Sequence, residues 1–168
     1  MKTLVTVATR HGATAEIGEA IAEQLRSMGL DVDVIPPDQV RSLAPYGAVV
    51  VGSGVYLGRW LAPAREFVTD HAEELRRLPV WLFGSGPITP VEDEADMVDG
   101  KQLRELVGAR DNRLFAGQLK RDGLSIFERV SVRMVGSPWG DYRPWDDVRR
   151  WASGIAEALT SEASLAAR

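Results

Sequence analysis

The sequence predicts an α/β domain built on a doubly wound, five-stranded parallel sheet, with strand order 2-1-3-4-5 and helices on both faces. Three observations support this fold class. Short apolar segments alternate with segments of helical periodicity, most connections are short, and the central apolar segments are continuous. Continuous apolar strands are typical of parallel sheets covered on both faces. The chain of 168 residues is long enough for one such domain, expected over residues 1–160.

Five segments are predicted as strands. They span residues 4–8, 30–35, 48–52, 80–83 and 113–117. The second segment alternates polar and apolar residues, which favours an edge strand, and Pro36 and Pro37 end it. The third and fourth segments are continuous and apolar, so we expect them at the centre of the sheet.

Helical segments follow these strands. The first ends at Gly29, and the second begins near Trp60 or Pro63 and runs through Leu75. A short helix is expected over residues 101–107, after an acidic stretch that extends to Asp99 and is predicted to be a solvated loop. The last helix is expected over residues 145–159, and residues 161–168 are expected to form a disordered tail. The apolar stripe of this last helix consists of Trp145, Val148, Trp151, Ala152, Ile155 and Leu159.

Composition excludes several classes of function. A net charge of -4 disfavours a general nucleic-acid binder. Without cysteine there is no thiolate metal site or iron–sulfur cluster, so redox chemistry would need an organic cofactor. Two histidines at unrelated positions give no metal-ligand spacing, and we expect no metal site. No segment resembles a signal peptide or a membrane span, so we expect a cytoplasmic protein.

The turn between the first strand and the first helix has the composition of an anion site. A helix N-terminus offers unpaired backbone N–H groups, threonine hydroxyls can donate to a phosphate, and glycine allows close approach. The alternative is a plain turn in which Thr9 or Thr14 caps the helix. The candidate residues are Thr9, Arg10, His11, Gly12, Ala13 and Thr14.

Two further loops are expected at the same edge of the sheet. In doubly wound sheets, ligands bind outside the carboxyl ends of the strands, here between the first and third strands. The loops after the third and fourth strands contribute Ser53, Gly54, Val55, Tyr56, Gly58, Ser85, Gly86 and Pro87 as candidate cofactor contacts.

These loops resemble those of flavodoxin-like proteins, with the greatest similarity to the menaquinone-dependent protoporphyrinogen oxidase type. The resemblance rests on the segments 8–14, 52–58 and 115–117, and on the extra segment before the last helix. It implies FMN, with its phosphate on the first loop and its isoalloxazine ring between the other two. His11 stands where the usual flavodoxin loop has a hydroxyl residue, so Arg10 is expected to supply charge there.

The third loop contains no aromatic residue to stack on a flavin. Tyr56 or Trp60 would have to provide any stacking, and we favour Tyr56, with Trp60 packing at the start of a helix. No catalytic side chain is assigned, because the resemblance carries none onto this chain.

Residues 118–143 are too long for an ordinary connection, which indicates a function. Their apolar spacing fits both a helix and a strand, and we predict a helix, partly on the resemblance. The segment is locally basic, so it is predicted to cap the flavin site and select the electron partner. The alternative is that it only packs on the edge of the sheet.

The sequence therefore predicts an FMN-binding oxidoreductase or electron-transfer protein, with a quinone or another redox partner and a porphyrinogen as a candidate substrate. Membrane contact would be at most peripheral, no nucleic acid is expected, and a homodimer is left open. The alternative is a flavodoxin-fold interaction or signalling module that has lost its flavin. The phosphate loop favours the first hypothesis, because a module that binds no anion has no need of it.

Overall fold

The computed structural model describes residues 2–56, 58–86, 98–119 and 140–166. Within them, a parallel sheet has the order β2-β1-β3-β5-β6. Its strands are β1 (Lys2–Ala8), β2 (Asp31–Val34), β3 (Tyr46–Tyr56), β5 (Val80–Gly86) and β6 (Asp111–Ala116). Counted along the chain, these main strands follow the order 2-1-3-4-5, which confirms the predicted fold class.

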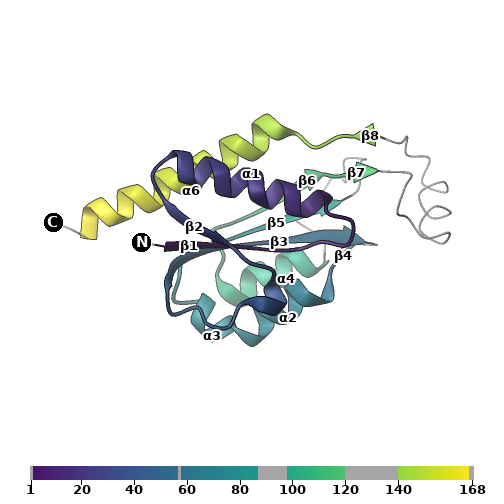
Figure 1. Ribbon diagram of the computed structural model, residues 1–168. Coiled ribbons are helices and arrows are strands. Elements are labelled where there is room, and N and C mark those ends of the chain that lie inside the picture. Colours follow the sequence, from purple (N-terminus) through teal and green to yellow (C-terminus); the bar gives the residue numbers. More distant parts are fainter. Residues whose placement is uncertain (1, 57, 87–97, 120–139, 167–168) are drawn as a thin grey trace.

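Three short strands lie at the edges of this arrangement. β4 (Arg59–Trp60) pairs antiparallel with the end of β3, and β7 (Gln118–Leu119) pairs antiparallel with β8 (Gly140–Asp141) in a separate ribbon. The ribbon lies beyond the carboxyl end of β6 (Figure 1). The two ends of the segment 118–143 therefore form strands, and the helix predicted from the apolar spacing of residues 124–134 lies outside the described residues.

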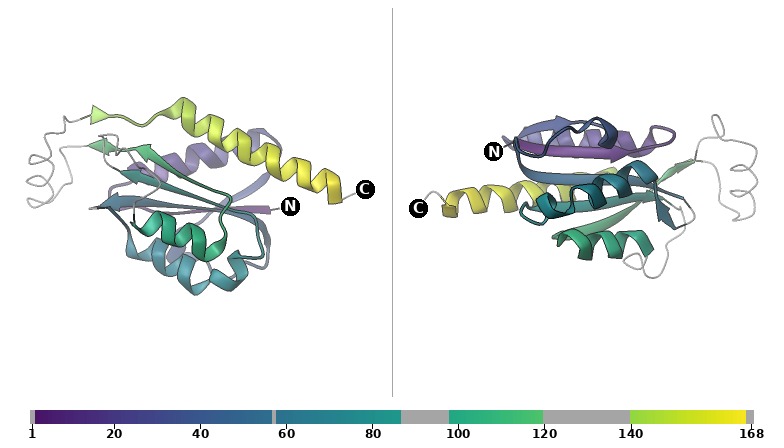
Figure 2. Two further views of the ribbon diagram at one scale, coloured as in Figure 1. Left: turned by 180° about the vertical axis from the view of Figure 1, so that it is seen from behind. Right: turned by 90° about the horizontal axis from the view of Figure 1, so that it is seen from below.

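Helices cover both faces of the sheet. α1 (Ala13–Ser27) and α6 (Trp145–Ala166) lie on one face, and α2 (Ala62–Asp70), α3 (Ala72–Leu75) and α4 (Val98–Val107) lie on the other (Figure 1). A 3-10 turn, η1 (Pro37–Gln39), follows β2. The same layers are seen from behind, and in the view from below the teal and green helices lie in front of the sheet (Figure 2). In the described part of the chain, no helix combines the length and apolarity needed to span a bilayer.

Successive residues of the central strands point to opposite faces of the sheet. Ala48 and Val50 of β3 belong to the core under α1 and α6, whereas Val49 and Val51 belong to the core under α2 and α4. All four side chains are fully buried. Burial on both faces is the reason that this strand is continuously apolar in sequence.

Aromatic packing fixes α6 on the sheet. Phe83 of β5, Phe115 of β6 and Trp151 of α6 have ring centroids 5.7–6.1 Å apart. Trp151 Nε1 donates a hydrogen bond of 2.8 Å to Asp111. Burial opposes the charged form of Asp111, but the hydrogen bonds from Trp151 and Arg113 outweigh it and lower the pKa of this carboxyl. The predicted apolar stripe of α6 is confirmed, since its residues pack in this core.

Two helix boundaries differ from the predictions. The helix expected to run through Leu75 is interrupted at His71 (φ −101°, ψ 15°). Backbone hydrogen bonds from His71 to Phe67 and from Leu75 to His71 continue across the break, so it is a local distortion. α6 extends to Ala166, so the predicted end near Leu159 and the tail expected from residue 161 are wrong for residues 161–166.

β3 and β5 extend farther than predicted. Residues 53–56 and 84–86, expected as loops, belong to these strands. Ser53 and Gly54 continue the parallel ladder opposite Gly84 and Ser85, whereas Val55 and Tyr56 pair antiparallel with β4. A glycine of β3 also leaves room for an aromatic ring of β5, because Gly52 lies opposite Phe83 in the ladder. At Gly52, an added Cβ would lie 2.2 Å from Cζ of Phe83.

Gly52→Ala should therefore lower the free energy of unfolding by about 1–3 kcal/mol or more, because the buried ring of Phe83 has no space to yield. The matched control is Gly154→Ala on α6, where an added Cβ meets nothing within 4 Å. This variant should be more stable by about 0.5–1 kcal/mol, since alanine is the better helix former. Urea unfolding measures both changes, and a neutral Gly52→Ala would contradict the close packing of β3 and β5.

Candidate flavin site

The candidate site lies where β1, β3 and β5 end. All three strands are parallel, so their carboxyl ends meet at one edge of the sheet (Figure 1). The chain leaves β1 toward one face and β3 toward the other, because α1 and α2 cover opposite faces. This divergence is the topological switch point at which doubly wound sheets bind ligands.

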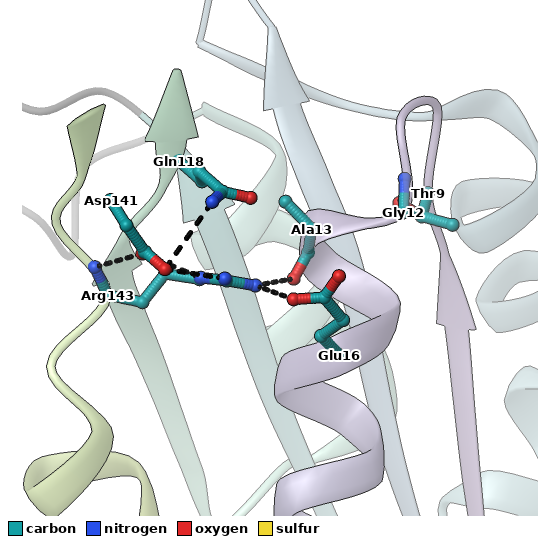
Figure 3. Close-up of polar contacts among 7 residues, drawn as sticks. All are labelled: Thr9, Gly12, Ala13, Glu16, Gln118, Asp141 and Arg143. Atoms are coloured by element: carbon teal, nitrogen blue, oxygen red, sulfur yellow. Dashed lines mark hydrogen bonds and ion pairs between the residues drawn. The ribbon is translucent and has the colours of Figure 1, made fainter. Parts of the chain in front are cut away.

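The first loop begins α1 without a capping side chain. Gly12 is the N-cap residue and adopts φ +85°, a left-handed conformation that favours glycine. Its backbone N–H donates to Oγ1 of Thr9 at 3.0 Å, which closes the loop on itself (Figure 3). Within the part of the chain that the structure describes, no side-chain cap bond is made at the start of α1. The backbone N–H groups after Gly12 are therefore positioned for an anion, and the predicted alternative of a threonine cap is not found.

Thr14 brings the first loop against β3. Its side chain is buried, and its hydroxyl oxygen lies 3.4 Å from the position that a Cβ on Gly54 would occupy. The same Cβ would lie 3.1 Å from Cε2 of Tyr56. An added Cβ would therefore crowd the tyrosine ring, while it would make an ordinary contact with the Thr14 hydroxyl.

Tyr56 also contacts the first loop through its ring. The guanidinium carbon of Arg10 lies 4.5 Å from the ring centroid, and the His11 ring meets the tyrosine edge-on at 6.5 Å. Arg10 and His11 are exposed, whereas Tyr56 is half-buried. The structure thus brings these three predicted site residues together at the end of β3.

Ser53 supports this edge of the sheet through two hydrogen bonds. Its buried hydroxyl donates to the Gly54 carbonyl at 2.9 Å and accepts from the backbone N–H of Leu61, also at 2.9 Å. It therefore braces the hairpin of β3 and β4, in which Gly58 has φ +75°. Trp60 is 4% exposed and packs in the core, as predicted, although it lies in β4 and not at the start of a helix.

The third loop joins the edge from β5. An added Cβ on Gly86 would lie 2.8 Å from Cβ of Val55, and one on Gly117 would lie 3.5 Å from Oγ of Ser85. Val55 and Ser85 are buried, so they pack beneath the surface of this edge of the sheet. Pro87 lies outside the described residues.

The sequence did not predict the role of Arg143. This arginine is 8% exposed, and its guanidinium forms two bonds with the carboxylate of Asp141, at 2.8 and 2.7 Å. It also donates to Ala13 O at 3.2 Å and to Glu16 at 2.5 Å (Figure 3). Arg143 therefore ties the ribbon of β7 and β8 to the first turn of α1.

The charge of Arg143 is stabilised by these partners. The hydrogen bond to Asp141 raises the pKa of the guanidinium, burial acts in the opposite direction, and Glu16 adds to the increase. The ring of Trp145 lies 4.5 Å from the guanidinium carbon. Asp141 is only two residues away, but Ala13 and Glu16 are 130 and 127 residues away, so the local sequence does not reveal the link to α1.

Asp99 is the second residue that the sequence analysis missed. It was expected in a solvated loop, and this is wrong, because Asp99 lies in α4 and is 4% exposed. Oδ2 accepts the backbone N–H of Trp60 at 2.9 Å. A sequence signal existed, since Asp99 precedes the buried Leu103 and Val107 by four and eight residues and so shares their helical stripe. The rest of the acidic stretch, residues 92–96, lies outside the described residues.

The chain belongs to the flavodoxin domain family, whose pattern matches residues 4–143. This membership implies that the cofactor is a flavin. It agrees with the resemblance stated from the sequence and with the position of the candidate site at the switch point.

Two relatives and one solved structure are similar to this chain over most of its length. The chain is 24% identical to the protoporphyrinogen IX dehydrogenase [quinone] of Escherichia coli (strain K12), over 98% of this chain and 99% of the relative. It is 27% identical to the protein of the same name from Leishmania major, over 92% of this chain and 74% of the relative. A solved flavodoxin from the domain Archaea has a TM-score of 0.66 at 18% identity, covering 95% of this chain and 99% of the other, which supports the fold.

Arg143→Met should lower the free energy of unfolding by about 1–3 kcal/mol, because it removes several bonds to charged partners from a buried position. Arg143→Lys should recover only part of this loss, since lysine lacks the bidentate fork that Asp141 accepts. Urea unfolding at neutral pH is the measurement.

The matched control for this prediction is Arg149→Met. Arg149 is exposed and pairs with the exposed Asp146, so its loss should change stability by less than about 0.5 kcal/mol. Equal effects of Arg143→Met and Arg149→Met would show that the buried network adds no stability.

Proposed function

We propose that this chain is an FMN-binding oxidoreductase that oxidises a porphyrinogen and passes the electrons to a quinone. The observation that carries the proposal is the uncapped start of α1 at the switch point, with Tyr56 beside it. The relatives in Escherichia coli and Leishmania major, named protoporphyrinogen IX dehydrogenase [quinone], support the choice of substrate and acceptor.

The first loop suits a terminal phosphate. It offers backbone N–H groups at the positive end of the α1 dipole, the hydroxyl of Thr14 and the exposed cation of Arg10. FMN carries one such phosphate, whereas a dinucleotide would need a pyrophosphate site, and the chain has no G-x-G-x-x-G fingerprint. The proposed phosphate contacts are Thr9, Arg10, His11, Gly12, Ala13 and Thr14.

The ends of β3 and β5 suit a planar ring. Gly54, Gly58 and Gly86 place no side chains at this edge of the sheet. Tyr56 provides an aromatic surface that is only half-buried. The remaining proposed ring contacts come from Ser53, Val55, Ser85 and Pro87. Bound flavin would supply the redox chemistry, while the chain binds and orients it and limits the access of water.

We further propose a cytoplasmic protein that meets its quinone by peripheral contact with a membrane. The basic segment 120–133 would fit an anionic surface, although it lies outside the described residues. A homodimer remains compatible with this proposal.

Thr14→Val removes the hydroxyl and keeps the shape of the buried side chain. It should weaken FMN binding about ten-fold or more, because one hydrogen bond to a charged acceptor is worth roughly 1.5–3 kcal/mol. Thr14→Ser should restore most of the affinity, since it retains the hydroxyl. Fluorescence titration of the full chain with FMN measures the dissociation constants.

The matched control is Thr160→Val, which removes a hydroxyl that donates to the Ala156 carbonyl on α6. It should leave FMN affinity unchanged. Equal affinities of the unaltered chain and Thr14→Val would remove Thr14 from the phosphate site. Failure of the unaltered chain to bind FMN would instead favour an interaction module without flavin.

A further inference from the structure

We propose that Asp99 is a positioning residue for the flavin ring, because it holds the hairpin of β3 and β4 against α4. The proposal rests on the flavin site described above. Asp99 touches no part of the first loop in the contacts described, so its effect is expected on the ring side of the site.

The hairpin needs an external partner. β4 contains only Arg59 and Trp60, and a ribbon this short has little stability of its own. The N–H of Trp60 donates to Asp99 Oδ2 at 2.9 Å in a buried position. This carboxylate oxygen thus takes the place of a neighbouring strand, because a buried N–H without an acceptor would be costly.

Two arginines balance the charge of the buried carboxylate. Arg59 Nη2 lies 3.5 Å from Oδ1, and Arg65 Nη1 lies 3.9 Å from Oδ2. Arg59 belongs to β4 and Arg65 to α2, so one side chain of α4 links three elements. The arrangement specifies where the hairpin sits relative to both helices.

The position of Tyr56 depends on this hairpin. Tyr56 pairs with Arg59 across it, and Val55 pairs with Trp60. On the far side of Trp60, the N–H of Leu61 is held by Ser53. Asp99 and Ser53 therefore fix two successive backbone N–H groups, so that the end of β3 and Gly58 are held in one place.

Stability alone explains this carboxylate poorly. Burying a charge and its counter-charges is often neutral or unfavourable compared with apolar packing of similar volume. A carboxylate does give one defined geometry, because it must meet a particular N–H and two particular cations. Such a device is expected where the position of a loop matters for a ligand.

The test compares Asp99→Ala and Asp99→Asn in the full chain. Dissociation constants are measured for FMN and for riboflavin, together with the visible absorption spectrum of the bound flavin. Asp99→Ala should weaken the binding of FMN and of riboflavin by the same factor, about ten-fold, and should shift the absorption spectrum of the bound flavin. Asp99→Asn should have a smaller effect, because its amide oxygen can still accept from Trp60.

The matched control is Asp111→Ala. Asp111 accepts from the Asn112 backbone, from Arg113 and from Trp151, but it lies at the start of β6, at the opposite end of the sheet. The Asp111→Ala variant should be less stable, while its affinities for both flavins and its absorption spectrum should be unchanged. Hydrogen exchange of the Trp60 amide, measured without flavin, should accelerate in Asp99→Ala and not in Asp111→Ala.

Each outcome decides one claim. If the unaltered chain binds neither flavin, the proposed function fails and this inference with it. If the unaltered chain binds both and the Asp99 variants bind them with the same affinity and spectrum, only the inference is overturned. Weakened FMN with unchanged riboflavin would also overturn it, because the effect would then lie at the phosphate. Should Asp99→Ala fail to fold, Asp99→Asn gives the decision.

Discussion

Burial of the sheet on both faces is the constraint on which the rest of this structure depends. Val49, Val50 and Val51 are fully buried against helices on opposite sides, so the middle of this central strand has no access to solvent through either face. Groups that can meet a ligand are therefore expected at the ends of the strands, where the backbone turns. Among the described residues, the start of α1 and the hairpin of β3 and β4 are two such places.

Two buried charges hold these places in position. Arg143 ties the start of α1 to the ribbon after β6, and Asp99 ties the hairpin after β3 to α4 and α2. Arg143 contacts α1 on one face of the sheet, and Asp99 belongs to α4 on the other face. The proposed phosphate site and the proposed ring site therefore have separate supports, and they meet where Arg10 and Thr14 lie beside Tyr56 and Gly54.

Much of this could be predicted from the sequence. Apolar continuity predicted the central strands, and the threonine and glycine residues after β1 predicted the first loop, because both signals are local. The strand order was predicted from the alternation of strands and helices and from the length of the chain. Arg143 and Asp99 were missed because burial of a charge depends on partners far along the chain. β4 was missed because two residues carry no periodicity. The strand ends at residues 53–56 and 84–86 were expected as loops because glycine and serine disfavour strands. Pairing of β3 with β4 and β5, and of β5 with β6, overrides that preference.

The central claim is that the start of α1 binds the phosphate of FMN. It is tested most directly by comparing the affinities of the unaltered chain for FMN and for riboflavin, which differ only in that phosphate. Two or more hydrogen bonds to a charged acceptor predict that FMN binds at least about one hundred-fold more tightly. Equal dissociation constants for the two flavins would contradict the account, because the uncapped helix start and Thr14 would then have no part in binding.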